Sequence, residues 1–277
     1  KIVFDMRGFW IDERVEWNIW KKNRLKYKFF KFLEKKLLIS AQSIITLTDD
    51  ARNEVIKIIK NNVQSKIYET IHTCVDKSNF KKPKHLLTKK SNKLIFCHLG
   101  AISTRYDLDR VFWFISEVNK YNKCQLLIIN QKEKPFILDR IKKNNIDKSL
   151  IKIISLNFNE VPNYLEKIDF GIFFPKKGFY LNGFFPTKFA EFIASKKPIV
   201  TSKINNDFDK LMKTYSLGLV LQRDVNIFSK KYIDELLSLK ESESFKINSS
   251  LLIKKHLDVK IGINKYLSVY DKILNNV

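Results

Sequence analysis

The stretch Pro186-Thr187-Lys188-Phe189-Ala190-Glu191-Phe192-Ile193-Ala194-Ser195-Lys196-Lys197-Pro198-Ile199-Val200 decides the fold of this chain. Pro186 and Thr187 suit the start of a helix, and Pro198 ends it before a short apolar strand. A helix start presents unpaired backbone N–H groups and the positive end of the helix dipole, so it can hold a phosphate. The stretch therefore predicts a helix followed by a strand, with a candidate anion site where the helix begins.

Two charged side chains follow the start of this helix. Lys188 adds a mobile positive charge, and Glu191 projects from the same side about one turn further in, where it can accept hydrogen bonds from the vicinal hydroxyls of a sugar. A phosphate site beside a ribose site indicates a nucleotide. The alternative is an ordinary amphipathic helix that buries Phe189, Phe192 and Ile193 and leaves both charges in solvent.

The length and composition of the chain are those of a globular α/β protein. Its 277 residues, 44% hydrophobic and 13% aromatic, suffice for two modest domains or one large one. No run of apolar residues is long enough to span a membrane, and no cleavage signal is present, so we expect a cytoplasmic protein. Three widely spaced cysteines, Cys74, Cys97 and Cys124, indicate reduced thiols. Because Lys1 opens directly into an apolar strand, we expect that an N-terminal portion precedes it.

The charge balance is strongly basic, with a net charge of +23. Only eight of the 52 basic residues are arginine, and no zinc-finger, RNP or helix-turn-helix pattern occurs. We therefore expect no nucleic-acid partner. A basic surface is also compatible with an anionic membrane surface.

A basic and aromatic helical pattern runs from Trp10 to Leu38 and predicts one long helix. Its apolar positions recur at helical spacing, which is typical of a stripe that faces a core. A helix that interleaves aromatic residues with lysines can instead lie on a membrane interface. Both alternatives stay open, since one helix can serve both. The stripe consists of Leu25, Phe29, Phe32, Leu33 and Leu37.

Strands and helices alternate along the rest of the chain, which predicts parallel sheets with helices on both faces. Ligands of such sheets bind beyond the carboxyl ends of the strands. The expected strands are 2–4, 43–48, 67–71, 94–99, 125–130, 151–155, 170–174, 199–201 and 217–221, and the expected helices include 49–59, 108–119, 135–144, 159–167 and 248–274.

Several candidate ligand residues follow these strands. Gly100 would let the backbone approach a ligand closely, and Arg105 could pair with a diphosphate, although a tight turn with a surface arginine is the alternative. Asn130 and Phe158 could frame a base by hydrogen bonds and stacking. A loop containing two glycines, residues 176–185, runs into the helix start and is typical of a closing substrate loop. No GxSxG, HExxH or Walker A motif is present, and His98, inside an apolar strand, is interpreted as a core residue.

Several segments resemble the GT-B glycosyltransferases, specifically the group-1 or family-4-like retaining enzymes of bacterial cell-surface polysaccharide synthesis. The most specific is residues 186–200, which are similar to the family pattern P-x-K-x-x-E-Y-x-A-x-G-K-P-V-V. The resemblance covers nearly the whole chain. The other similar segments are residues 5–13, 41–56, 66–76, 96–103 and 160–175.

The resemblance implies a GT-B type α/β fold in two parts. Residues 1–80 would be the C-terminal part of a first, acceptor-side α/β domain, and residues 81–93 a lysine-rich linker. Residues 94–277 would be a Rossmann-like parallel-sheet domain that binds a nucleotide-sugar, with the last helix crossing back to the first domain.

The resemblance also assigns roles to single residues. Glu191 would hold the donor ribose, Lys188 would lie near its phosphates, and Arg105 would replace the basic residue of the glycine loop. The family's first glutamate of its E-x7-E pair is Gly183 here, which leaves the donor sugar undefined. The catalytic residues are unknown, and we expect the base upstream of Lys1. The full set of expected donor-binding residues is Glu191, Lys188, Arg105, Gly100, Thr187, Gly183, Phe158 and Asn130.

These observations predict that the full-length protein is a glycosyltransferase of the hexosyltransferase type, and they leave open whether this chain alone is active. It would move a sugar from a nucleotide diphosphate sugar to a glycan or lipid-linked acceptor, with no metal and no cofactor, at the inner face of the membrane or free in the cytoplasm. Two other classes stay open. A GT-B-like sugar-nucleotide epimerase would convert the nucleotide-sugar without an acceptor. A non-catalytic subunit would bind the nucleotide-sugar without converting it.

Overall fold

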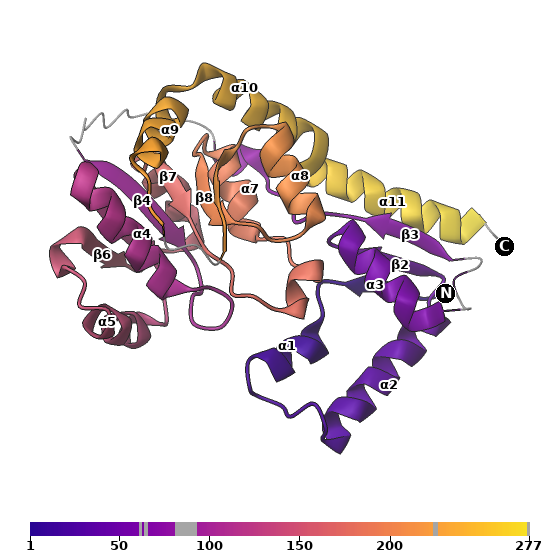
Figure 1. The fold of residues 1–277 in the computed structure, drawn as a ribbon. Helices are drawn as coiled ribbons and strands as arrows, with labels where there is room; N and C mark the ends of the chain where they lie inside the picture. Colours follow the sequence, from indigo (N-terminus) through magenta and orange to yellow (C-terminus); the bar gives the residue numbers. More distant parts are fainter. Residues whose placement is uncertain (61–62, 64–65, 81–92, 224–226, 276–277) are drawn as a thin grey trace.

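Two separate parallel sheets form the framework of the protein (Figure 1). The computed structural model describes residues 1–60, 63, 66–80, 93–223 and 227–275. Of the expected linker 81–93, residues 81–92 lie outside the described residues. Strands β1 to β3 make the first sheet, and strands β4 to β9 make the second.

The second sheet has the strand order β6-β5-β4-β7-β8-β9, with every pairing parallel. The chain reverses its direction of travel across the sheet between β4 and β7, which is the Rossmann order, and ligands of such sheets bind at this switch point. The strands are β4 (Leu94–Leu99), β5 (Cys124–Ile129), β6 (Ile151–Ile154), β7 (Phe170–Ile172), β8 (Ile199–Ser202) and β9 (Gly218–Leu221).

Helices cover both faces of the second sheet because its strands are apolar on both sides. One face carries α4 (Leu108–Tyr121), α5 (Lys134–Lys143) and α9 (Lys230–Glu241). The opposite face carries α6 (Val161–Leu165), α7 (Thr187–Ala194), α8 (Asn206–Thr214) and α10 (Glu243–Leu252). The start of α7 agrees with the prediction from the sequence.

Helix α7 lies unusually close to the sheet at β7. A Cβ atom at Gly171 would lie only 2.4 Å from the ring of Phe192, which is fully buried. Only glycine leaves room for that ring, so Gly171 sets the depth at which α7 sits against the strand. The position of the first turn of α7 therefore depends on this contact.

The first sheet is smaller and has the order β1-β2-β3, again parallel. Helix α3 packs on one face, and the C-terminal helix α11 packs on the other, so the end of the chain contacts the first sheet (Figure 1). A π-helical turn (Ile253–Leu257) leads into α11. The elements are β1 (Val3–Met6), β2 (Ser43–Thr46), β3 (Ile67–Thr70), α3 (Asp49–Ile59) and α11 (Val259–Asn275).

The predicted long helix from Trp10 to Leu38 is wrong in two respects. It is two helices, α1 (Trp10–Glu16) and α2 (Leu25–Ser40), separated by a turn in which Asn18 adopts a left-handed conformation with φ of 58°. Asparagine tolerates that conformation, which ends α1. Of the two alternatives for the apolar stripe of α2, the one that faces a core is wrong, because the five side chains are exposed and the buried residues of the helix lie on its opposite face.

Helices α3 and α8 begin face to face and cap each other across the two sheets. The carboxylate of Asp207 accepts hydrogen bonds from the backbone N–H groups of Asp49 (2.8 Å) and Asp50 (3.3 Å) at the start of α3. In return, the carboxylate of Asp50 accepts from the backbone and side-chain amides of Asn206, both at 2.8 Å. Each of the two helices thus supplies a carboxylate that pairs with unpaired N–H groups at the start of the other.

Candidate functional site

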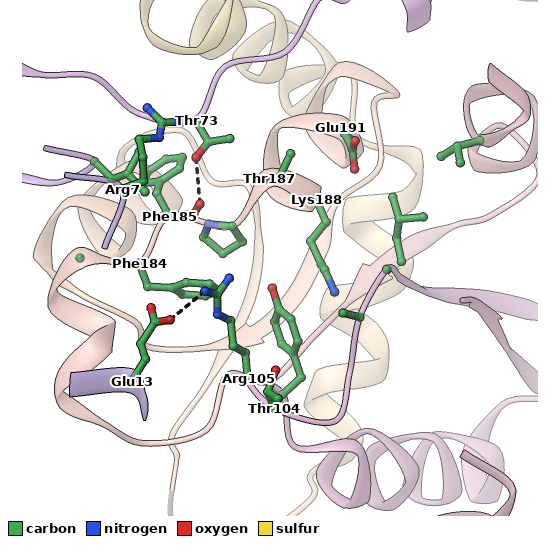
Figure 2. Close-up of a pocket in the computed structure, with 18 of the residues that line it drawn as sticks. Arg7, Glu13, Thr73, Thr104, Arg105, Phe184, Phe185, Thr187, Lys188 and Glu191 are labelled. Carbon is green, nitrogen blue, oxygen red and sulfur yellow. Dashed lines mark hydrogen bonds and ion pairs between the residues drawn. The ribbon is translucent and has the colours of Figure 1, made fainter. Parts of the chain in front are cut away.

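A cavity of about 690 Å³ opens between the carboxyl ends of the two sheets (Figure 2). Its volume is in the range of sites that bind small organic ligands. The part of the chain that carries the first sheet contributes Arg7, Leu47 and Thr73 from beyond its strands, and Glu13 and Trp17 from α1 and the residue after it. The remaining lining residues are Leu99, Gly100, Ala101, Thr104, Arg105, Tyr106, Phe158, Val161, Gly183, Phe184, Phe185, Pro186, Thr187, Lys188 and Glu191.

The first turn of α7 forms one wall of this cavity. Thr187 and Lys188 are its first two residues, and their backbone N–H groups have no hydrogen-bond partner within the described part of the chain. Pro186, which precedes them, offers no N–H donor and no side-chain cap. Two free N–H groups and the positive end of the helix dipole therefore face the cavity, as an anion site requires.

Lys188 is buried and points from α7 into this space (Figure 2). Its Nζ lies 3.0 Å from His98 Nε2 and 3.8 Å from the centre of the Tyr106 ring. His98 Nδ1 lies 3.1 Å from the carbonyl oxygen of Ile172, which can only accept, so Nδ1 carries the proton and Nε2 accepts from Lys188. The ammonium is held by a neutral imidazole and an aromatic face.

The electrostatics of Lys188 favour an incoming anion. Burial lowers the pKa of Lys188 to about 7, and the nearby carboxylate of Glu191 only partly opposes that shift. Burial likewise raises the pKa of Glu191, against the effect of Lys188, and lowers that of His98 well below its ordinary value. Among the described residues, no carboxylate lies within ion-pair distance of Lys188. A phosphate would supply the missing counter-charge.

Glu133 holds the loop that follows β4, residues 100–106, which we call the glycine loop. Its carboxylate accepts hydrogen bonds from the backbone N–H groups of Ile102 (2.7 Å) and Ser103 (3.0 Å), and from the side chain of Asn130 (2.7 Å). Burial raises the pKa of Glu133, but these hydrogen bonds outweigh burial and leave it below its ordinary value. The amides of Gly100, Ile102 and Ser103 in this loop are thus already occupied, whereas the start of α7 keeps its two free backbone donors.

Asn130 lies outside the cavity lining. Its amide nitrogen donates to the carbonyl oxygen of Gly100 (3.1 Å) as well as to Glu133, and its oxygen accepts from the N–H groups of Lys132 and Glu133. The sequence predicts a residue that frames a base, whereas these contacts position the glycine loop.

Arg105 lines the cavity but pairs with Glu13 of α1, in the part of the chain that carries the first sheet (Figure 2). Its guanidinium donates to Glu13 at 3.0 Å and lies over the rings of Trp17 (5.3 Å) and Phe184 (5.8 Å). The Glu13 carboxylate is buried, whereas the Arg105 side chain is 42% exposed, so solvent screens this pair in part. Arg105 therefore joins the two halves at the cavity wall, and a diphosphate would have to compete with Glu13 for it.

The loop 176–185, predicted to close over substrate, is a packed segment between the two halves. Tyr180 is buried, and its hydroxyl donates to the carbonyl oxygens of Lys176 (2.9 Å) and Arg105 (3.0 Å). The side-chain amide of Asn205 and the hydroxyl of Thr73 hold further carbonyl groups of the segment. In this structure the segment is held in place by these contacts, and its closing over a substrate stays a prediction.

Gly183 lies where this packed segment touches the turn between β1 and α1. A Cβ atom there would lie 3.0 Å from the ring of Phe9 and 3.3 Å from Cα of Gly8. A glutamate, which the resemblance leads one to expect at this position, would not fit without moving Phe9. The packing around Gly183 thus leaves room for glycine but not for the glutamate side chain that the resemblance leads one to expect.

Phe158 stands at the rim of the cavity after β6. Its side chain is 60% exposed, which is unusual for a phenylalanine and leaves one ring face free to stack on a planar ligand. The side chain of Glu160 accepts a hydrogen bond from the backbone of Asn157 (2.8 Å) and so fixes the turn that carries this ring.

Seven of the eight predicted site residues line one cavity, and Asn130 alone lies behind it. The sequence reasoning missed four residues that shape the site: His98, Tyr106, Glu133 and Glu13. His98 is indeed buried in β4, but it also supports Lys188. Its place two residues before the loop glycine was the only signal available.

A scan of protein-family models and a search of curated proteins find no match for this chain. Solved structures do resemble it. Sucrose-phosphate synthase from Thermosynechococcus elongatus aligns with a TM-score of 0.70 at 10% identity over 99% of this chain and 68% of that one. HepE from Anabaena, in complex with UDP and glucose, gives 0.70 at 10% identity over 99% and 71%. A glycosyltransferase from Rickettsia africae gives 0.69 at 15% identity over 90% and 68%.

At these identities the likeness concerns the backbone. It extends through both sheets, since two of the three alignments cover 99% of the chain. The cavity lies between those sheets, at the switch point of the second. The chain therefore has the GT-B fold of glycosyltransferases.

Proposed function

We propose that this protein transfers a hexose from a nucleotide diphosphate sugar to a glycan or lipid-linked acceptor of cell-surface polysaccharide synthesis. The observation that carries the proposal is the group formed by the free amides of α7, the buried Lys188 and the carboxylate of Glu191, all facing one cavity. The nucleotide-sugar is a substrate, and no further cofactor is needed. HepE, of the same fold, binds UDP and UDP-glucose, which makes UDP the first nucleotide to test.

In this proposal the diphosphate lies at the start of α7. As the bond to the sugar breaks, negative charge develops on the diphosphate, and the N–H groups of Thr187 and Lys188 with the Lys188 ammonium stabilise it. These donors are fixed before substrate arrives, so little reorganisation is required. We propose that transfer needs no metal ion, because these backbone donors, the helix dipole and the Lys188 ammonium would neutralise the departing diphosphate.

Replacing Glu191 with alanine tests the nucleotide site. We expect UDP, GDP, ADP or CDP to raise the melting temperature of the protein, and Glu191→Ala to abolish the rise, because the carboxylate would bind the ribose hydroxyls. Glu235→Ala, on an exposed part of α9 away from the cavity, is the matched control and should keep the full shift. Absence of a shift with every nucleotide would refute the proposal.

Phe158→Ala should weaken nucleotide binding without affecting folding. Stacking of a base on an aromatic side chain contributes about 1 to 3 kcal/mol, and the rim position of Phe158 makes about 1 kcal/mol the expected loss, roughly fivefold in Kd. Phe158→Tyr keeps the ring and should bind like the wild type. Titration calorimetry with UDP measures both, and equal affinity of Phe158→Ala and wild type would remove Phe158 from the site.

Nucleotide binding should weaken as the pH rises from 7 to 9. The free protein holds the pKa of Lys188 at about 7, so above this pH the amine must first take up a proton in order to pair with the diphosphate. The cost is at most about 1.4 kcal/mol per pH unit, or tenfold in Kd. The phosphates stay ionised throughout this range because their last pKa is about 6. A flat profile of Kd against pH would contradict this account.

A further inference from the structure

Helix α2 carries its apolar residues on the outside of the molecule. Leu25, Phe29 and Phe32 follow one another at a spacing of four and three residues, and their side chains are 84%, 56% and 56% exposed. Leu33 and Leu37 lie beside this stripe and are exposed as well. In Figure 1, α2 runs along the outer edge of the first domain, with α1 and α3 on its inner side.

The inner face of α2 combines the buried apolar Leu38 with a polar group nearer the start of the helix, unlike the wholly apolar inner face of an ordinary surface helix. Tyr27 donates a hydrogen bond to Asp12 of α1 at 2.8 Å. Lys31 donates to Asp12 at 3.0 Å and also pairs with Glu34, which is buried. These contacts fix the rotation of α2 about its axis. The apolar stripe therefore cannot turn inward without breaking a buried ion-pair network.

The charges around the stripe are all positive. Lys26, Lys28, Lys35 and Lys36 are exposed, and Lys36 lies 5.6 Å from the centre of the Phe32 ring. The only acidic residue of α2 is Glu34, which faces inward. Long lysine side chains can keep their ammonium groups at the level of lipid headgroups while the apolar residues between them enter the bilayer.

An aromatic cluster extends this surface at the start of α2. Trp10 and Trp20 have ring centres 5.3 Å apart, and Trp20 stacks on Phe30 at 5.2 Å. Trp10 is partly exposed, and tryptophan is enriched at the boundary between lipid and water. Lys26 lies over the ring of Trp20 and adds a further positive charge.

We propose that the outer face of α2 is a docking surface for an anionic lipid bilayer. Leu25, Phe29 and Phe32 enter the headgroup region, and the surrounding lysines pair with lipid phosphates. The positive charge of this face favours an anionic bilayer over a second copy of this chain as its partner, because contact between two such faces would bring rows of lysines together. Among the described residues, no helix is long and apolar enough to cross a bilayer. No residue of α2 lines the cavity, so this proposal stands apart from nucleotide binding.

Sedimentation with lipid vesicles tests the surface. The purified protein should bind vesicles of phosphatidylcholine with about one third phosphatidylglycerol at physiological ionic strength, and bind pure phosphatidylcholine at least about tenfold more weakly. Phe29→Ser/Phe32→Ser keeps the net charge but should lower binding to the anionic vesicles about tenfold or more. Both side chains are exposed, so circular dichroism should show unchanged folding.

The matched control removes two exposed apolar residues elsewhere. Ile263→Ser/Leu267→Ser on α11, where the side chains are 51% and 53% exposed, should bind anionic vesicles within about twofold of the wild type. Lys28→Gln/Lys35→Gln should also weaken binding, most clearly at low salt. Equal binding by Phe29→Ser/Phe32→Ser and the control would overturn the proposal, since attraction would then arise from overall charge. Loss of a dimer in Phe29→Ser/Phe32→Ser, with vesicle binding intact, would overturn it in favour of a second copy.

Discussion

Replacing Lys188 with methionine should weaken the binding of a nucleotide diphosphate by about 2 to 4 kcal/mol, roughly 30- to 800-fold in Kd. Methionine has a similar length but no charge, so the cavity keeps its shape while the anion loses its buried partner. The free protein should be no less stable, because Lys188 has no carboxylate partner among the described residues and its burial is unfavourable. Calorimetric titration and urea unfolding separate the two effects.

Lys196→Met is the control for this variant. Lys196 follows the other end of α7, and its Nζ contacts the side chains of Ser249 and Ser250 on α10, away from the cavity. Its nucleotide affinity should stay within about twofold of the wild type. If Lys188→Met instead binds UDP as tightly as Lys196→Met does, the diphosphate does not lie at the start of α7.

Gly171→Ala should destabilise the protein by about 2 to 4 kcal/mol and reduce nucleotide binding at the same time. The new methyl group would lie 2.4 Å from the ring of Phe192, and both positions are buried, so α7 must move away from β7. Thr187 and Lys188 would move with the helix. Urea unfolding measures the stability change, and a titration with UDP at a temperature where the variant remains folded measures the loss of affinity.

A second substitution provides a sharper test of this contact. Phe192→Leu makes room for the methyl group, so Gly171→Ala/Phe192→Leu should be more stable than the sum of the two single effects predicts, by about 1 kcal/mol or more. Strict additivity would contradict the claim that Gly171 and Phe192 together set the depth of α7.

Much of the fold could be predicted from local patterns. The apolar run Leu94–Leu99 and the helix that begins at Thr187 are where the sequence places them, because each is bounded by proline, glycine or lysine. Helices α8 and α9 were not predicted. They are short or polar, and their burial depends on neighbours that only the folded sheet provides.

Helix α2 shows what periodicity leaves open. The spacing of Leu25, Phe29 and Phe32 identifies one face of a helix but not the direction in which that face points. The direction depends on Asp12, which draws Tyr27 and Lys31 inward from a separate helix. Such a contact between elements has no local signature in the sequence.

In the candidate site, too, some residues could be predicted from the local sequence and others could not. Glu191 and Lys188 could be found because they share one helix, three residues apart. His98 could not be assigned as the partner of Lys188, since the two are separated by 90 residues and meet only because of the strand order of the sheet. The roles of Glu133 and Glu13 likewise depend on how the loops fold back.

The mutual capping of α3 and α8 makes separation of the two halves a cooperative event. Asp207 serves the start of α3, and Asp50 serves the start of α8, so a hinge motion that breaks one of these contacts breaks the other. Both carboxylates and the four N–H groups that donate to them would then have to be rehydrated in a single step. Opening of the cleft therefore requires the contact of Asp207 with α3 and the contact of Asp50 with α8 to break together.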